Sequence, residues 1–360
     1  MQPRPAIFVV LALAAACGRT GNTPPPVAAP PAVAPAAVGP DQEPRLTAVD
    51  VFDTDPGSVE HVLARHGDAL HSLLRDSADA KVHAVTEAIR ADGGYAYVEP
   101  STITYYEPRG RISYLTIDIV DQRDVAQRMP FSPRPAGTCA DPGGLIAAWQ
   151  AYEATAFDLL KRGELAPPAD CPSFHCFGDP RQPALRARAA EMTAGVPAHV
   201  DELATILRDD SRQAYRGAAA YLLAYAPDGR TVVADLVPAL HDASSLVRNN
   251  AMRVLAEIAL HHPEVDVPVA PIIEALGYPA ASDRNKAAAT LYRMLGRPSG
   301  SSMYPRVVRD AGQILLAMLR LQQPNNHDFA YKILKLISGR GYGERDYAAW
   351  QTWLAQAAVD

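Results

Sequence analysis

The chain has 360 residues, enough for two domains and an additional unstructured segment, because one domain commonly takes about 100 to 200 residues. Hydrophobic residues make up 48% and charged residues 21%, which permits a buried core, and the 32 prolines are numerous enough to mark linkers and turns. The formal net charge of −6 gives no general reason to expect nucleic-acid binding, since that binding depends on neutralising phosphates with Lys and Arg.

Residues 1–16 have the pattern of an export signal. Met1 to Arg4 carry one positive charge, and Ala6 to Ala16 form an apolar run too short to span a bilayer as a stable helix. The segment from Leu13 to Gly18 reads Leu-Ala-Ala-Ala-Cys-Gly and resembles the bacterial lipobox, in which small residues precede a Cys that becomes the lipidated N-terminus. The alternative is an ordinary signal-peptidase site followed by an incidental Cys, and either route exports the chain.

The lipobox resemblance implies an address as well as an anchor. Cys17 would carry several acyl chains, and anchoring by several chains is stable where one chain is only marginal. Gly18, not Asp, follows this Cys, which in Gram-negative lipoproteins implies transfer to the outer membrane, with the protein facing the periplasm. Residues 17–45 contain a Pro/Ala/Val tract that favours extended polyproline II, so we expect a lipid-anchored, disordered tether.

The first folded part is expected over residues 46–124. Leu46 to Phe52 alternate and are rich in β-branched residues, as in a half-buried strand, and the turn and N-cap residues from Asp55 precede a first helix. Lys81 to Ala91 form a second helix, and Tyr95 to Asp121 hold two strands joined by a Pro-Arg-Gly turn. The predicted order is therefore β-α-α-β-β.

This order resembles a POTRA domain, a small periplasmic module of outer-membrane assembly and secretion proteins. POTRA modules pair an exposed strand edge with a segment of a partner, so the resemblance implies a role in envelope assembly. An unrelated small α+β domain is the alternative, because a fold-level analogy does not fix a function.

Residues 125–183 are expected to form a Cys-containing helical connector. It holds a Pro-rich stretch, a helix from Gly144 to Lys161, and three candidates for one disulfide in an oxidising compartment: Cys139, Cys171 and Cys176. Their spacing leaves the pairing open. The alternative is a closed zinc site of Cys139, Cys171, His175 and Cys176, which has the number and type of ligands that Zn²⁺ prefers. We favour the disulfide and expect His175 to be a partly buried packing residue.

The sequence from residue 184 to residue 360 repeats itself in one frame. Successive segments are marked at intervals of 33, 36 and 43 residues by four leucines: Leu207, Leu240, Leu276 and Leu319. A second Leu follows each of them by fifteen residues: Leu222, Leu255, Leu291 and Leu334. Four alanines share one position in the same frame: Ala218, Ala251, Ala287 and Ala330. Such periods are typical of helix pairs that stack to bury an apolar face.

These units resemble HEAT repeats. Members of that family often carry an Asp in the turn and an Arg six residues later, which form a ladder between repeats. Asp210 with Arg216 and Asp242 with Arg248 match this spacing. The resemblance implies an all-α solenoid with a concave binding face, and an amphipathic helix from Tyr347 to Ala357 would cap its C-terminal end.

The solenoid segment is mildly basic, since its Lys and Arg outnumber its Asp and Glu. Several polar and cationic residues recur near the start of the second helices, which in HEAT-like arrays tend to line the concave face. As residues that grip an acidic partner we expect Arg216, Arg248, Asn249, Arg284 and Lys286. The alternative is that these are solvated charges or intramolecular ladder charges.

The sequence has no His-Glu-x-x-His, Gly-rich phosphate loop, Gly-x-Ser-x-Gly or calcium-loop motif, so we expect no catalytic residue, no cofactor and no enzymatic activity. The predicted fold is multidomain, with a small POTRA-like α+β domain followed by an all-α HEAT-like solenoid. The predicted function is a non-catalytic scaffold that binds another envelope protein and reaches the membrane through its lipid anchor. The alternative is a lyase-type HEAT-like enzyme or a metal-binding protein with a site near Cys171, His175 and Cys176.

Overall fold

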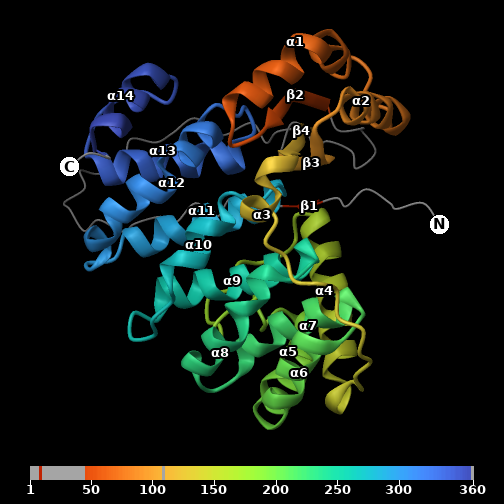
Figure 1. Ribbon diagram of the computed structural model, residues 1–360. Coiled ribbons are helices and arrows are strands. Elements are labelled where there is room, and N and C mark those ends of the chain that lie inside the picture. The colour runs from red at the N-terminus through yellow and green to blue at the C-terminus, as the bar shows by residue number, and fades with distance from the viewer. Residues whose placement is uncertain (1–7, 10–44, 108–109, 358–360) are drawn as a thin grey trace, which may run out of the picture.

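The computed structural model describes residues 8–9, 45–107 and 110–357, and it shows a small α+β part followed by a curved array of helices (Figure 1). This architecture agrees with the predicted division into a small α+β domain and an all-α part. The predicted lipidation site Cys17, and the tether as far as residue 44, lie outside the described residues. Their assignments stay predictions.

The α+β part has the predicted order of elements, namely β2 (Arg45–Phe52), α1 (Pro56–Ser72), α2 (Asp79–Asp92), β3 (Tyr95–Glu107) and β4 (Gly110–Asp121). Asp55 caps α1 by accepting a hydrogen bond from the Gly57 N–H, and Pro56 occupies the first turn, where a missing N–H costs nothing. After α2, Gly93 and Gly94 have φ values of 97° and 91°, which glycine adopts without strain, and the chain turns there into β3.

The sheet has the strand order β1-β3-β4-β2 in the described part of the chain. β3 and β4 form an antiparallel hairpin, and β2 pairs parallel with the other edge of β4. A parallel pair needs a crossover connection, and here α1, α2 and β3 lie between β2 and β4 in the chain. β1 (Phe8–Val9) pairs parallel with β3 at Ile103 and Thr104.

Alternation along the strands gives this sheet two different faces. One face packs against α1 and α2 in an apolar cluster of Val51, Val98, Ile117 and Ile119 with Val62, Leu70 and Ile89. The opposite face is more polar and lies against the end of the array formed by α11 to α13 (Figure 1). There Asp50 accepts hydrogen bonds from the backbone N–H groups of Gln322 and Gln323, and Tyr105 donates one to Asn325 at 2.6 Å.

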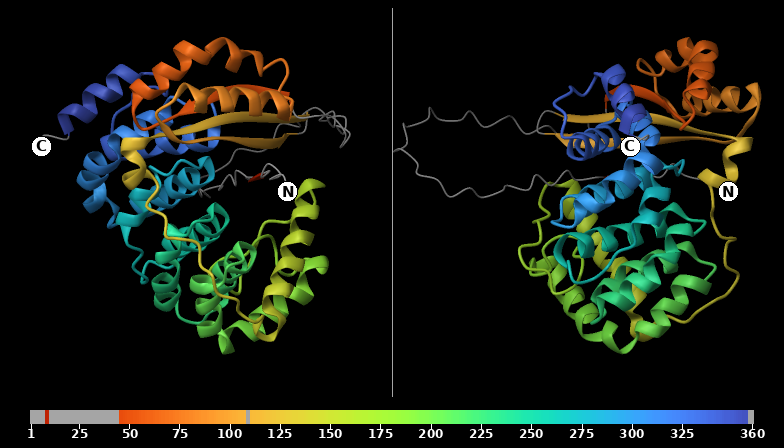
Figure 2. Two further views of the ribbon diagram at one scale, coloured as in Figure 1. Left: turned by 45° about the vertical axis from the view of Figure 1, so that its right-hand side comes forward. Right: turned by 60° about the vertical axis from the view of Figure 1, so that its left-hand side comes forward.

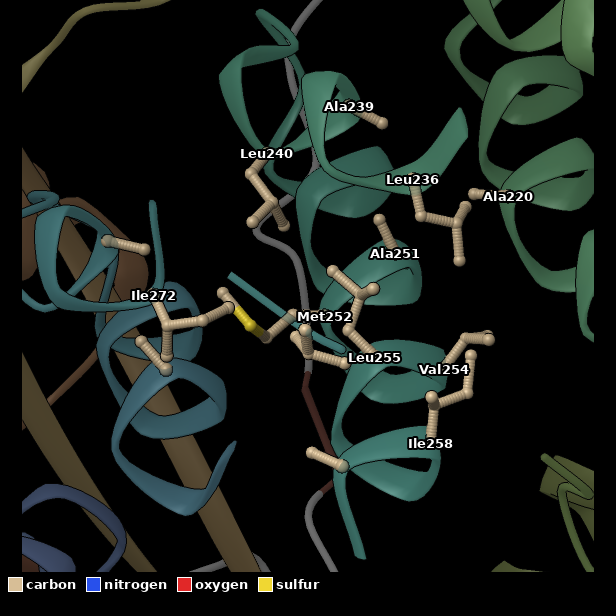
Figure 3. Close-up of a cluster of buried hydrophobic side chains, with 14 of the residues drawn as sticks. Ala220, Leu236, Ala239, Leu240, Ala251, Met252, Val254, Leu255, Ile258 and Ile272 are labelled. Atoms are coloured by element: carbon tan, nitrogen blue, oxygen red, sulfur yellow. The ribbon is translucent and has the colours of Figure 1, made fainter. Parts of the chain in front are cut away.

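The helical part contains four successive helix pairs, which are α6 (Val200–Asp209) with α7 (Gln213–Leu222), α8 (Gly229–Leu236) with α9 (Ser245–His261), α10 (Val269–Ala275) with α11 (Ala281–Leu295), and α12 (Tyr304–Leu319) with α13 (Pro324–Ser338). The eight leucines and four alanines of the predicted repeat frame are all buried. Figure 3 shows Met252 of α9 pointing towards Ile272 of α10 and Val254 pointing to the opposite side, so neighbouring helices cover α9 on both sides. The predicted stacking is confirmed.

The array curves, and the second helix of each pair lies on its inner side (Figure 2). Each second helix packs closely against the second helix of the next pair, in the order α7, α9, α11 and α13. The first helices have little direct contact with one another, as seen for α6, α8 and α10. This difference is expected when one layer has the smaller radius of curvature. The concave face is therefore lined by α7, α9, α11 and α13.

An extended strap connects the two parts by running along the turns of the helix pairs (Figure 2). It begins after α3 (Val125–Arg128), whose Arg128 donates to the Gly277 carbonyl at 2.9 Å. Further along, the Ser132 N–H donates to the His241 carbonyl, and the Gly137 N–H donates to the Asp209 carbonyl. The strap thus passes the turns of three units in reverse order and leads to the opposite end of the array.

The strap ends at α4 (Leu145–Lys161), which packs against α5 (Pro183–Gly195) and α7. Trp149 of α4 stacks on Tyr221 of α7, with ring centroids 3.8 Å apart. At the other end, α14 (Tyr347–Ala357) buries Trp350 and Leu354 and packs against α12, as predicted for the C-terminal cap. None of the helices in the described ranges is both long enough and apolar enough to cross a membrane.

Candidate functional site on the inner face of the helical array

A ladder of buried ion pairs joins the units of the array. Arg216 of α7 forms a bidentate pair with Asp242 of the next unit, at 2.6 and 2.8 Å, and also donates to the Asp210 carbonyl of its own unit. Arg248 of α9 repeats this arrangement with the Asp283 carboxylate, at 2.6 Å, and with the Asp242 carbonyl. The Asp and Arg positions predicted for a ladder do form one, but each Arg pairs with the carboxylate of the following unit.

The last rung of the ladder comes from outside the array. Arg284 of α11 contacts the carbonyl of Tyr278 in its own unit, and its guanidinium lies 2.7 Å from the carboxylate of Asp118 in β4. The guanidinium also lies over the Phe52 ring, 3.6 Å from the centroid. At this rung the α+β part therefore supplies the carboxylate that the next helix pair supplies at the other two rungs.

The ladder corrects the predicted concave binding residues. Arg216, Arg248 and Arg284 are at most 4% exposed and pair with carboxylates of this chain, so they are not free to bind an acidic partner. The alternative reading, intramolecular ladder charges, is confirmed for these three. Asn249 is also buried, and Lys286 alone among the five is partly exposed.

A second set of charged residues lies on the neighbouring faces of α9 and α11. On α9, Asn249, Arg253 and Glu257 follow one another at intervals of four residues, which places them on one side of the helix. Arg253 donates from Nε to the Asn249 side-chain oxygen at 3.1 Å. On α11, Arg293 pairs with Glu257 at 2.7 Å, and the Lys286 amine contacts the Asn285 side-chain oxygen at 3.3 Å. We call Arg253, Lys286 and Arg293 the cation cluster.

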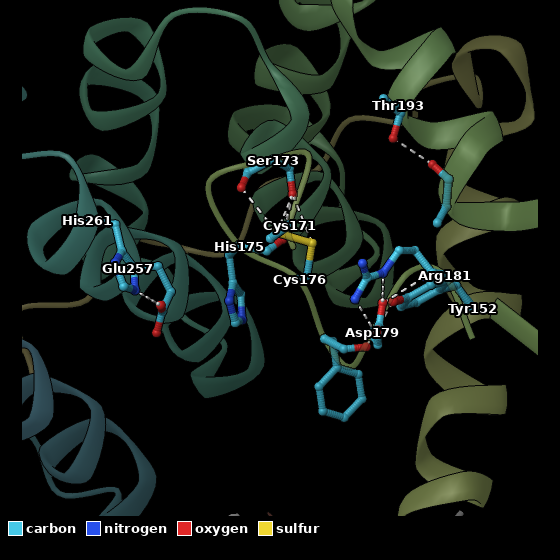
Figure 4. Close-up of a disulfide and its surroundings, with 12 residues drawn as sticks. Tyr152, Cys171, Ser173, His175, Cys176, Asp179, Arg181, Thr193, Glu257 and His261 are labelled. Atoms are coloured by element: carbon cyan, nitrogen blue, oxygen red, sulfur yellow. Dashed lines mark hydrogen bonds and ion pairs between the residues drawn. A yellow bond between two sulfur atoms is a disulfide. The ribbon is translucent and has the colours of Figure 1, made fainter. Parts of the chain in front are cut away.

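The loop that carries the cysteines brings His175 next to this cluster. A disulfide joins Cys171 and Cys176, and the His175 ring points away from it (Figure 4). The ring lies 4.9 Å from the Tyr221 ring, centroid to centroid. His175 Nε2 and the Tyr221 hydroxyl are both buried and have no hydrogen-bond partner in the described structure. His175 is a packing residue, as predicted, but it also presents an unsatisfied nitrogen.

Electrostatic interactions show that these groups act on one another. Desolvation first, and then the charges of Arg253 and Arg293, hold the pKa of Lys286 well below its ordinary value. Desolvation and the same cations, with Lys286, lower the pKa of His175 to about 3, so that its ring is neutral near pH 7. Desolvation raises the pKa of Glu153 on α4, against the opposing effect of Arg253. The inner face thus gathers cations that repel one another in poorly solvated surroundings.

The zinc alternative does not fit the structure. Cys171 and Cys176 are bonded to each other, so neither is available as a thiolate ligand. Cys139 is the unpaired thiol among the described residues, and it lies in the strap, where its backbone contacts Asp210 and Arg212. No group of three or more His, Cys, Asp or Glu residues in the described ranges is arranged to hold a metal ion.

Arg253 and Arg293 are the members of the cluster that the sequence analysis did not single out. The ladder spacing drew attention to the residues at the start of α9 and α11, one and two turns before these arginines. The signal that identifies Arg253 is the polar row from Asn249 to Glu257 on a helix whose other sides are apolar. No protein-family model matches this sequence, and a search of curated proteins finds no match.

Proposed function

We propose that the chain is a non-catalytic scaffold of the cell envelope that binds another protein on the concave face of its helical array. The observation that carries this proposal is the cation cluster, because its basic side chains lie on the inner-layer helices α9 and α11 and are not part of the ladder. The three ladder arginines each pair with a carboxylate, whereas Arg253 has an amide oxygen as its hydrogen-bond partner. Charged side chains that are held in place without a structural partner are typical of a recognition surface.

The resemblances seen in the sequence support the same function. Helix pairs in a common frame, with Asp and Arg in a ladder, are what a HEAT-like solenoid would contain, and such arrays bind along an extended concave surface. The order β-α-α-β-β supports a POTRA-like module, which would place the protein among envelope assembly factors. The lipobox at Cys17 supports an outer-membrane anchor facing the periplasm.

The rigidity of the surface also favours binding without catalysis. The ladder, the strap and the docked sheet connect the units of the array through buried ion pairs and backbone hydrogen bonds, which should restrict its flexing. A rigid surface loses little conformational entropy when a partner binds, so such preorganisation favours affinity. The proposed partner is an envelope protein with an acidic segment, because Arg253 and Lys286 on this face have no carboxylate in ion-pair contact among the described residues.

Site-specific photo-crosslinking in cells that express the full chain tests this function. A crosslinker replaces Tyr292 on α11, which is 36% exposed and lies next to the cluster in sequence, and a control crosslinker replaces the exposed Arg208 on α6 of the outer layer. We expect an adduct with one membrane-associated protein from position 292 and no such adduct from position 208. Equal adducts from both positions, or none from position 292, would contradict binding on the inner face.

A further inference from the structure

Two members of the cation cluster lack a carboxylate partner among the described residues. Arg293 has the Glu257 carboxylate at 2.7 Å, but no carboxylate in the described part of the chain is in ion-pair contact with Arg253 or Lys286. Glu153, on α4, is close enough to Arg253 for each to influence the ionisation of the other. Two of the three basic side chains of the cluster, Arg253 and Lys286, therefore have an amide oxygen and no carboxylate in contact.

Hydrogen-bonding groups without partners border the same place. His175 Nε2 and the Tyr221 hydroxyl are buried and unsatisfied, which costs free energy unless a bound group supplies the missing hydrogen bonds. Tyr221 lies on α7 and interacts electrostatically with Arg253, while His175 interacts with all three cations. Groups from α4, α7, α9, α11 and the disulfide loop thus converge on one region of the concave face.

We propose that Arg253, Lys286 and Arg293 form a site for one carboxylate of an acidic partner segment, with His175 and the Tyr221 hydroxyl as neighbouring hydrogen-bonding groups. This inference rests on the proposed function and specifies its anchoring point. Arg253 and Lys286 each lack a carboxylate in ion-pair contact, and a carboxylate would supply acceptor oxygens for both donors. Charge-assisted hydrogen bonds from guanidinium and ammonium groups to a carboxylate are among the strongest that proteins form.

The lysines of the chain allow a direct measurement at this site. There are five, and reductive methylation with ¹³C-formaldehyde gives each a resolvable NMR signal: Lys81, Lys161, Lys286, Lys332 and Lys335. The Lys286 signal, assigned with a Lys286→Arg variant, should titrate at the lowest pH of the five. A tetra-glutamate peptide should raise its titration midpoint by about one pH unit, as expected when an opposite charge comes into contact. A tetra-glutamine peptide is the matched neutral probe and should leave it unchanged.

Two substitutions test the assignment in opposite directions. Arg253→Met should abolish the response of Lys286 to tetra-glutamate, while Arg188→Met, at an exposed position of α5, should preserve it. Glu257→Gln removes the carboxylate that competes for Arg293 and should tighten binding of tetra-glutamate several-fold. Circular dichroism would show whether Arg253→Met folds. If it does not, the tighter binding of tetra-glutamate expected for Glu257→Gln still tests the site.

Inorganic phosphate provides the remaining comparison. A rise in the titration midpoint of Lys286 with tetra-glutamate supports the carboxylate site, whether or not phosphate also raises the midpoint. The carboxylate site is overturned if only phosphate raises the midpoint or if neither probe does. It is also overturned if Glu257→Gln binds tetra-glutamate more weakly than the natural chain. If tetra-glutamate binds but crosslinking finds no partner at position 292, the site stands and the scaffold function fails. If a partner is crosslinked but Lys286 does not respond to tetra-glutamate, only this inference fails.

Discussion

The Asp118 carboxylate in β4 lies 2.7 Å from the Arg284 guanidinium in α11, so a strand of the α+β part completes the ion-pair ladder of the helical array. Both side chains are buried, and Arg284 also covers the Phe52 ring. Arg216 and Arg248 each find their carboxylate in the next helix pair, and Arg284 finds an equivalent carboxylate in the sheet. The sheet is therefore part of the array's electrostatic structure.

Arg284→Met tests how much this rung stabilises the protein. The substitution leaves the Asp118 carboxylate buried without its cation, so we expect the free energy of unfolding to fall by about 3 to 5 kcal/mol at pH 7.5. Urea denaturation followed by circular dichroism measures this change. The control is Glu191→Ala, which removes an exposed ion pair with Arg188 and should cost about 0.5 kcal/mol or less. Equal effects of the two substitutions would show that the rung is not a structural contact.

Asp118 also gives stability an unusual dependence on pH. Desolvation, opposed by Arg284, raises the pKa of this carboxyl from 3.8 to about 6. Between these values the folded protein binds a proton that the unfolded chain does not, so this group's contribution to stability increases as the pH falls from 6 to 4. The contribution is fully present at pH values below 3.8, the pKa of this carboxyl in the unfolded chain, and it is lost as the pH rises through about 6.

Asp118→Asn isolates this contribution, because the other carboxyl groups are common to both proteins. We expect the free energy of unfolding of the variant, relative to that of the natural chain, to decrease as the pH is lowered from 7 to 4. Urea titrations at intervals of half a pH unit would show the trend. A difference that is constant over this range, or that changes in the opposite direction, contradicts the raised pKa.

The repeat frame was the most predictable part of the structure, and for a physical reason. Each helix pair buries the same Leu and Ala positions against its neighbours, so one spacing recurs along the chain. The ladder was predictable as a set of Asp and Arg positions, but its pairing was not, because Arg216 reaches the next unit's Asp242. The order of elements in the α+β part followed equally well from alternation and turn residues.

Contacts between distant segments could not be predicted from local patterns. Asp118 and Arg284 belong to different parts of the fold, and nothing near either residue indicates the other. The cysteine spacing left the pairing open until the structure joined Cys171 to Cys176. Of the cation cluster, Lys286 was among the predicted binding residues, but Arg253 and Arg293 were not, because their position beside it depends on how α9 and α11 pack.

Gly137→Ala tests the strap. A Cβ at this position would lie 2.5 Å from the Asp209 carbonyl oxygen, which is backbone and cannot move aside easily. The Gly137 N–H donates to that oxygen, and the Ser211 N–H donates to the Gly137 carbonyl, so the substitution disrupts both bonds. We expect stability to fall by about 1 to 3 kcal/mol and amide hydrogen exchange to accelerate in the strap.

Gly67→Ala is the matched control for this experiment. Gly67 lies within α1, and a Cβ there would meet nothing within 4 Å. Alanine is the better helix former, so this substitution should stabilise the protein by about 0.5 to 1 kcal/mol. If Gly137→Ala also stabilised the protein, the strap would not be held against the array as the structure has it.

Cys17→Ser tests the predicted lipid anchor. A thioether-linked lipid cannot form on serine, so the variant should lose incorporation of an alkyne-labelled palmitate analogue and move from the membrane fraction to the soluble fraction after cell breakage. Cys139→Ser is the control, because this unpaired thiol lies in the strap and its loss should leave labelling and fractionation unchanged. Labelling of the natural chain that persists in Cys17→Ser would contradict lipidation at this position. If the natural chain itself were unlabelled and found in the soluble fraction, the site would be an ordinary signal-peptidase site. The scaffold would then act from the periplasm without an anchor.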